Sequence, residues 1–154
     1  MKLKRAEKYL QISYNQYVTG IFRRPGQILP VPASGSRRMR IRKTLKGFHQ
    51  GRDVTLLFYC GSQDKARGKY LAGFHGAEKD HLVIVFDESA SFHKDIALRY
   101  RLRARGGGWL ELNSSRRRIR LWGRSLAYGR EPDRDLTRRV LSIAFPDFSC
   151  TCES

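Results

Sequence analysis

The chain contains few cysteines, and none of them forms a recognisable metal or disulfide pattern. Its three cysteines, Cys60, Cys150 and Cys152, are odd in number, and the only close pair is a C-x-C. This spacing is typical of neither a disulfide framework nor a zinc knuckle. Alternate residues of a strand share a face, so Cys150 and Cys152 are predicted to be small core residues in a protein of the reducing cytoplasm.

Long apolar runs are also absent. The two longest, LLFYC at 56–60 and LVIVF at 82–86, have the length of a strand and are too short for a membrane span. The basic first residues carry no continuous apolar stretch, so neither a secretory signal nor a membrane partner is predicted. A length of 154 residues with 40% apolar residues indicates one domain with a modest core, which we expect to be a monomer.

Acidic residues are scarce, because 14 Asp and Glu stand against 31 Lys and Arg, which gives a net charge of +17. Residues 1–67 hold 15 of the basic residues and 3 acidic ones, whereas residues 68–154 hold 16 and 11. This asymmetry predicts a basic, partly flexible N-terminal segment over residues 1–51, followed by a domain over residues 52–154. A basic segment attracts polyanions, so nucleic acid is a candidate partner, although charge alone names none.

The first part of the chain mixes weak and strong structural signals. Residues 4–18 are compatible with a short helix, and residues 23–38 contain three prolines and two glycines, which favours a linker. Met39 and Ile41 alternate with arginines, which allows a short strand. VTLLFYC at 54–60 predicts a strand that GSQD ends.

The middle of the chain predicts a hairpin, a short helix and a cationic strand. Residues 69–75 and 81–86 flank GAEKD, which is typical of a hairpin. A short helix should follow and end near Leu98. From Leu98 to Arg105 apolar residues alternate with arginines, which predicts a strand with one cationic face, broken by the glycines at 106–108. The candidate N-caps of the short helix are Asp87, Ser89 and Ser91.

The last part of the chain predicts two strands, a helix and a closing strand. The strands are expected at 109–113 and 117–122, on either side of a turn. An aspartate at position 133 or 135 caps the clearest helix, which Pro146 stops, and residues 147–152 predict the closing strand. About six strands and two helices in irregular alternation indicate the α+β class with a mixed sheet.

Five short motifs follow one another in an order that has a known parallel. They are GKY at 68–70, FHKDI at 92–96, GGG at 106–108, RIRLWGRSLAYG at 118–129 and FPDF at 145–148. In this order they resemble the Janus/Ocnus family, which includes the eukaryotic phosphohistidine phosphatase. The resemblance covers roughly residues 68–154. It implies a mixed sheet packed between two helices, no metal ion or organic cofactor, and the hydrolysis of phosphohistidine in a phosphorylated protein substrate.

The resemblance also implies roles for individual residues. His93, in the FHKDI motif, takes the catalytic position of the family. Ser125 and Ala127, in the SLAYG segment, take phosphate-binding positions, and so does Lys69, which precedes a tyrosine as the family lysine does.

The residue types at these positions suit phosphate chemistry on their own terms. Amides near Lys94, in the first turn of the expected helix, would supply N–H donors, and Ala127 would allow the backbone to approach closely. The Ser125 hydroxyl can donate a hydrogen bond. His93 titrates near physiological pH and could activate water or attack phosphorus directly. Two plainer interpretations stay open, namely SLAYG as a tight packing corner and His93 as a half-buried structural residue.

Two positions depart from the family pattern. The arginine that usually follows GGG is Trp109 here, and an arginine eight residues before the histidine is Val85. These changes bear on activity more than on the fold, because a shared fold does not guarantee a shared function. Three candidate cations could restore the missing charge, namely Arg105, Arg120 and Arg124.

Two other functions are compatible with the sequence. The first is a catalytically inactive family member that binds phosphate or a phosphoprotein without hydrolysing it. The second is nucleic-acid binding through the basic N-terminal segment and the arginine face at 99–105, helped by aromatic residues that could stack on bases. These aromatic residues are Trp109, Trp122 and Tyr128.

Overall fold

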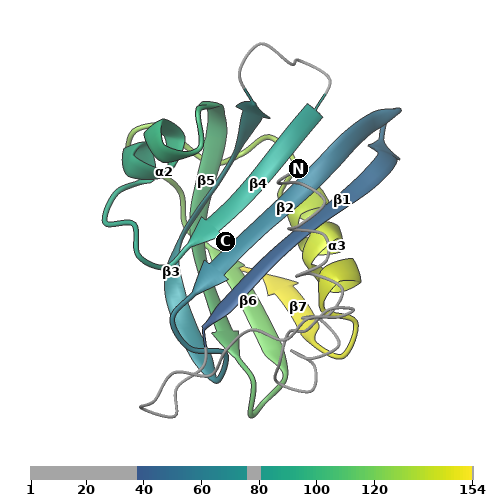
Figure 1. Ribbon diagram of the computed structural model, residues 1–154, viewed down its shortest axis with the longest axis vertical. Helices are drawn as coiled ribbons and strands as arrows, with labels where there is room; N and C mark the ends of the chain where they lie inside the picture. The colour runs from purple at the N-terminus through teal and green to yellow at the C-terminus, as the bar shows by residue number, and fades with distance from the viewer. Residues whose placement is uncertain (1–37, 76–80, 154) are drawn as a thin grey trace.

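The computed structural model describes residues 38–75 and 81–153, which form a seven-stranded sheet with one helix on each side (Figure 1). The strand order is β1-β2-β4-β3-β5-β6-β7, with β2–β4 and β6–β7 parallel and the other neighbours antiparallel. This mixed sheet between two helices confirms the predicted α+β class. The helix predicted at 4–18 lies outside the described residues. The elements are β1 (Met39–His49), β2 (Arg52–Cys60), β3 (Lys65–His75), β4 (His81–Asp87), α2 (His93–Arg99), β5 (Leu102–Asn113), β6 (Arg118–Trp122), α3 (Arg134–Ala144) and β7 (Ser149–Cys152).

The strand β1 extends the sheet beyond the boundary that the charge distribution indicated. It pairs antiparallel with β2, and a tight turn at Gln50 and Gly51, both with positive φ, joins the two strands. Met39 and Ile41 are 1% and 0% exposed, so their alternation with arginines does mark a strand. The sheet therefore begins at Met39, ahead of residue 52, and has seven strands where about six were predicted.

Alternate side chains of the sheet contribute to two separate cores. On one side, Val140 of α3 packs in a cluster with Leu56 and Phe58 of β2. On the other side, Ile96 of α2 packs in a cluster with Leu57 of β2. These two sides are called the α3 face and the α2 face below. Neither helix of the described residues has the length and apolar character needed to cross a membrane.

The helix α3 and the strand β7 lie where the sequence predicts them. The carboxylate of Asp133 caps α3 by accepting a hydrogen bond of 3.0 Å from the Leu136 amide, and the helix ends at Ala144, ahead of the proline. In β7, Cys150 is buried but Cys152 is exposed. The prediction of two core cysteines therefore holds for Cys150 only, because Cys152 lies at the end of an edge strand.

The helix α2 begins later than the candidate caps predicted. It starts at His93 with Phe92 as its N-cap, and the Asp95 carboxylate accepts a hydrogen bond of 3.0 Å from the Phe92 amide. The carboxylate of Asp87 is engaged elsewhere, because the Arg99 guanidinium donates to it at 2.7 Å. The predicted helix start was therefore wrong, because none of the three candidate residues, Asp87, Ser89 and Ser91, is the N-cap of α2.

The three glycines lie inside β5 and do not break it. The strand runs from Leu102 to Asn113, so the second half of the predicted cationic strand and the strand predicted at 109–113 form one element. The first half was predicted wrongly, because residues 98–101 form the end of α2 and the turn after it. Glycine is needed here because other backbone lies very close. A Cβ atom on Gly108 would lie 2.6 Å from the Trp122 carbonyl oxygen. The glycine run therefore marks close packing instead of a chain break.

Candidate functional site

The glycine segment of β5 brings two distant parts of the family pattern together. The Nε2 atom of His93, at the start of α2, lies 2.9 Å from the Gly108 carbonyl oxygen. The neighbouring Gly107 amide donates a hydrogen bond of 2.9 Å to the Gly129 carbonyl, in the loop between β6 and α3. The candidate histidine and the SLAYG segment are therefore both attached to the same glycine run.

The contact with Gly108 determines which nitrogen of His93 is available for chemistry. A carbonyl oxygen can only accept a hydrogen bond, so Nε2 carries the proton and Nδ1 keeps a lone pair in the neutral ring. The side chain is buried, and burial lowers the pKa of His93. The bond to Gly108 opposes this shift, the positive charge of Lys69 adds to it, and Glu131 opposes it. The neutral ring is thus favoured near pH 7.

A buried polar network holds the glycine run from the α3 face. The Glu131 carboxylate accepts hydrogen bonds from Arg134 at 2.9 Å, from the Tyr70 hydroxyl at 2.7 Å and from Thr137 at 3.0 Å. Arg134 also donates to the Gly107 carbonyl at 3.1 Å. Both charged side chains are 2% exposed. Burial raises the pKa of Tyr70, so its hydroxyl keeps the proton that it donates to Glu131. The network fixes the backbone that orients His93.

Sequence reasoning missed this network. Glu131 lies in a polar segment before α3 and Arg134 is the first residue of α3, and charged residues at such positions usually face solvent. Their spacing of three residues carries no distinctive sequence signal, and only the tertiary contact with β5 shows their role.

The SLAYG segment forms a tight turn closed by its own serine. The Ser125 hydroxyl accepts hydrogen bonds from the amides of Ala127 at 3.2 Å and Tyr128 at 3.1 Å. Ser125 is 1% exposed, whereas Leu126 at the tip is 99% exposed. Because the oxygen accepts both bonds, the hydroxyl proton remains free to donate. The arrangement is what a packing corner requires, and the phosphate-binding roles of Ser125 and Ala127 stay predictions.

A row of cations and indole rings lies beside His93 on the α2 face. Lys69, Trp109 and Trp122 are paired across β3, β5 and β6, and Lys69 Nζ lies 4.1 Å from the Trp109 ring centroid. The two indole rings stack with centroids 6.2 Å apart. The Arg67 guanidinium lies 5.3 Å from the Trp122 ring. Sequence reasoning missed Arg67, although its position two residues before Lys69 places it on the same face of β3.

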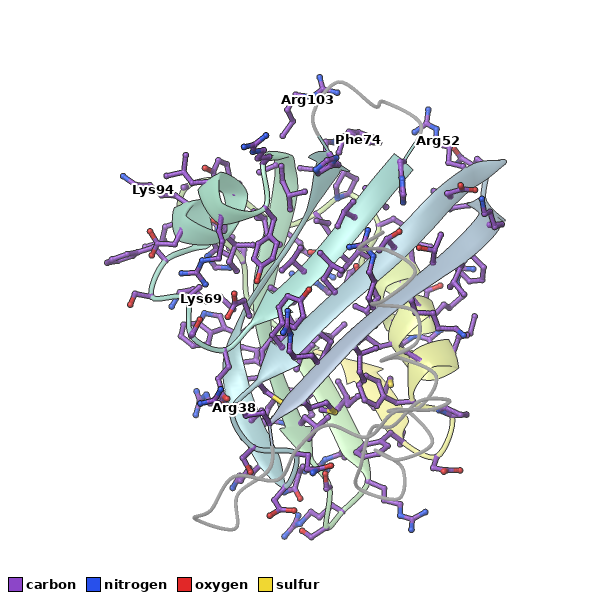
Figure 2. All side chains as sticks on the ribbon, viewed as in Figure 1. Arg38, Arg52, Lys69, Phe74, Lys94 and Arg103 are labelled. Carbon is purple, nitrogen blue, oxygen red and sulfur yellow. The ribbon has the colours of Figure 1, made fainter. Side chains whose placement is uncertain are left out.

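Of the other predicted cations, Arg120 joins this row, because its guanidinium lies 5.1 Å from the Trp122 ring centroid. Lys94 has an exposed side chain on α2, and Figure 2 shows it apart from Lys69. Arg120 is already paired, with Glu111 at 3.0 Å and Glu153 at 2.9 Å. Its charge is therefore largely balanced.

Arg105 lies on the wrong side of the sheet to restore charge beside His93. Its guanidinium lies 5.3 Å from the Phe74 ring on the α3 face. A register shift opposite Ala72 and Gly73 makes Arg105 an extra residue of β5, so it faces the α3 side although Trp109, four residues on, faces the α2 side. Arg124 is exposed in the loop after β6. Val85 is fully buried in the α2 core, so the second family arginine is replaced by a core residue.

The comparison with known families agrees with this arrangement of motifs. The family model described as Janus/Ocnus matches residues 61–149, which is more than half of the chain. The chain belongs to the Janus/Ocnus family. No curated protein matches it. The matched region begins just after β2 and ends at the start of β7, so it contains His93, the glycine run and the SLAYG turn.

Proposed function

We propose that this Janus/Ocnus protein hydrolyses phosphohistidine or another phosphoramidate in a protein substrate. The observation that carries the proposal is the hydrogen bond from His93 Nε2 to the Gly108 carbonyl, in a buried setting that favours the neutral ring. A neutral imidazole with one nitrogen held and the other bearing a lone pair is suited to take a proton or to attack phosphorus. Family membership supports the same chemistry.

In the proposed reaction, His93 Nδ1 takes a proton from the attacking water. The water oxygen bonds to phosphorus while the bond from phosphorus to the substrate nitrogen breaks. The proton then passes to the leaving nitrogen, so the products are phosphate and the free side chain of the substrate. Protonation of the leaving nitrogen makes this bond labile, which is why the proposed route needs positioning more than a metal ion.

Lys69 is the proposed phosphate cation. It is the cation that acts on the pKa of His93, and its Nζ atom stands over Trp109 on the same face of the sheet. Ala127 is exposed and small, so it is proposed to let the phosphate approach the turn, although its own amide donates to Ser125. The Ser125 proton and the amides near Lys94 are proposed to complete the phosphate contacts.

Trp109 favours a second candidate function, in which the site binds a phosphorylated protein without hydrolysing it. Its indole ring stacks on Trp122 at the position where the family usually has a phosphate-binding arginine. Loss of that charge lowers the expected stabilisation of the transition state more than it lowers ground-state binding. Nucleic-acid binding by the N-terminal segment remains a prediction from charge, because residues 1–37 lie outside the described structure.

The test is phosphate release from a histidine peptide phosphorylated with phosphoramidate, with a chelator present. We expect turnover by the wild type and a loss of roughly 100-fold or more in His93→Ala, the range for removal of a general base. The matched control is His75→Ala, because His75 is exposed at the end of β3 and should leave the rate unchanged. Equal rates for all three proteins would overturn the assignment of His93. Binding of the phosphopeptide without turnover would support the inactive alternative.

A further inference from the structure

A second group of cations lies on the α3 face, at one end of the sheet. Arg52, Arg103 and Arg105 surround the ring of Phe74, with guanidinium carbons 5.8, 6.0 and 5.3 Å from its centroid. Figure 2 shows Arg52, Phe74 and Arg103 together and well separated from Lys69. The group is therefore distinct from the candidate site around His93.

Two of these arginines keep an unbalanced charge. Among the described residues, neither Arg52 nor Arg105 takes part in an ion pair, although other basic side chains of this part of the chain do, such as Lys46, Arg99 and Arg138. Like charges gathered at one ring repel one another, and an anion between them would remove that repulsion. The arrangement thus favours an anionic ligand.

The same arginines border a hollow of about 160 Å³ between the sheet and the start of α3. Its apolar lining includes Phe74, Leu82 and Leu136. A volume of this size accommodates about one benzene ring. Two carboxylates also line it, but Glu131 is held by its buried network and Asp133 caps α3.

A wider hollow of about 390 Å³ adjoins the first and leads outward. It shares Arg52, Phe74 and Arg105 with the first hollow and adds Arg103 and Ala104. A ligand with a charged head and one apolar group would meet both environments at once. The head would lie among guanidinium groups, which bind carboxylate and phosphate through paired N–H donors, and the apolar group would pack on Phe74.

We propose that this hollow binds a small amphipathic anion. Its apolar part is a single aromatic or branched group, and its head is a phosphate or a carboxylate held by Arg52 and Arg105. The site is independent of the hydrolysis proposed at His93, because it opens on the other face of the sheet.

The experiment uses the full chain, labelled with ¹⁵N, and three probes that share one ring. Phenyl phosphate and phenylacetate carry the two candidate heads, and benzyl alcohol carries none. We expect saturable shifts of the Phe74 and Arg105 amide signals with the anions. The affinity for benzyl alcohol should be lower by roughly tenfold or more. The stronger of the two anions identifies the head. Equal binding of benzyl alcohol, or shifts confined to the signals around His93, would overturn the proposal.

Variants separate the arginines from general charge. Arg52→Gln combined with Arg105→Gln should weaken binding of the better anion by roughly tenfold or more. The control, Arg116→Gln with Arg118→Gln, removes the same charge from exposed positions of the β5–β6 hairpin and should stay within about twofold. His93→Ala should leave the Phe74 shifts unchanged. Equal weakening by both pairs would contradict the proposal, and dispersed spectra of each variant verify that it folds.

Discussion

The two faces of the sheet handle their cations in opposite ways. On the α2 face, Lys69 lies over the Trp109 ring beside a histidine that a backbone carbonyl orients. On the α3 face, Arg52 and Arg105 surround a phenylalanine at the rim of a hollow, without a carboxylate partner in the described residues. The first face thus holds an oriented histidine, for which we propose chemistry, and the second holds a group of arginines, for which we propose binding alone. Basic residues can therefore support catalysis or ligand binding, depending on the groups that they surround.

The largest expected effect comes from breaking the network that supports the α2 face. Glu131→Ala would leave the Arg134 guanidinium buried without its carboxylate, so we expect the free energy of unfolding to fall by about 3–5 kcal/mol. Urea unfolding measures this change. The matched control is Glu111→Ala, because its bridge to Arg120 is partly exposed and should contribute about 1 kcal/mol or less. Similar losses in the two variants would show that the network does not hold the site.

A smaller effect is expected at the SLAYG turn. Ser125→Ala removes the acceptor for the Ala127 and Tyr128 amides, which should lower the free energy of unfolding by about 1–3 kcal/mol. Ser115→Ala is the control, because its hydroxyl bonds to Asn113 in an exposed turn. If Ser125 also donates to phosphate, KM for the phosphopeptide should rise in conditions where the variant is fully folded. An unchanged KM would restrict Ser125 to the packing corner.

The smallest expected effect concerns the pKa of His93 and the charge of Lys69, which lowers it. His93 has a lowered pKa, so it stays neutral at a pH where a free histidine begins to charge, and the rate should fall only as pH drops through this lowered value. Lys69→Gln removes a charge that lowers this pKa, so the acidic limb of the pH–rate profile should move to higher pH. Lys65→Gln, an exposed change on the same strand, should leave the limb in place. A limb that moves to lower pH in Lys69→Gln would contradict the account.

The same lowered pKa has a consequence for stability. The unfolded chain binds a proton at His93 more readily than the folded chain does, so this residue makes the protein less stable as pH falls below about 6.5. Replacing His93 by alanine should therefore flatten the pH dependence of unfolding in that range. An NMR titration of the His93 ring gives the folded pKa directly.

Patterns with a local cause were predictable from the sequence. The apolar run of β2, the alternation at Met39 and Ile41 and the Asp133 cap of α3 were found where the sequence indicates them. The order of the motifs also predicted the family. These features depend on neighbours in the chain or on the order of short motifs, which can be read directly.

The missed features depend on tertiary contacts. The glycines at 106–108 were predicted to break the strand, but they lie inside β5 and allow the backbone of another segment to pack closely against it. Arg105 was a candidate cation for His93, but a register shift in β5 places it on the opposite face of the sheet. The buried pair Glu131 and Arg134 was not identified from the sequence, because its contacts with β3 and β5 come from distant segments. In each case the partner is far away in the sequence, so local patterns could not reveal it.

We propose that hydrolysis takes place on the α2 face and that the α3 face only binds an anion. Phosphate release from a phosphohistidine peptide tests it most directly, with His93→Ala compared against Arg52→Gln combined with Arg105→Gln. We expect His93→Ala to lose roughly 100-fold or more in rate, and the double arginine variant to keep the wild-type rate. Loss of activity in the arginine pair with His93→Ala unaffected would place the chemistry on the other face and contradict the account.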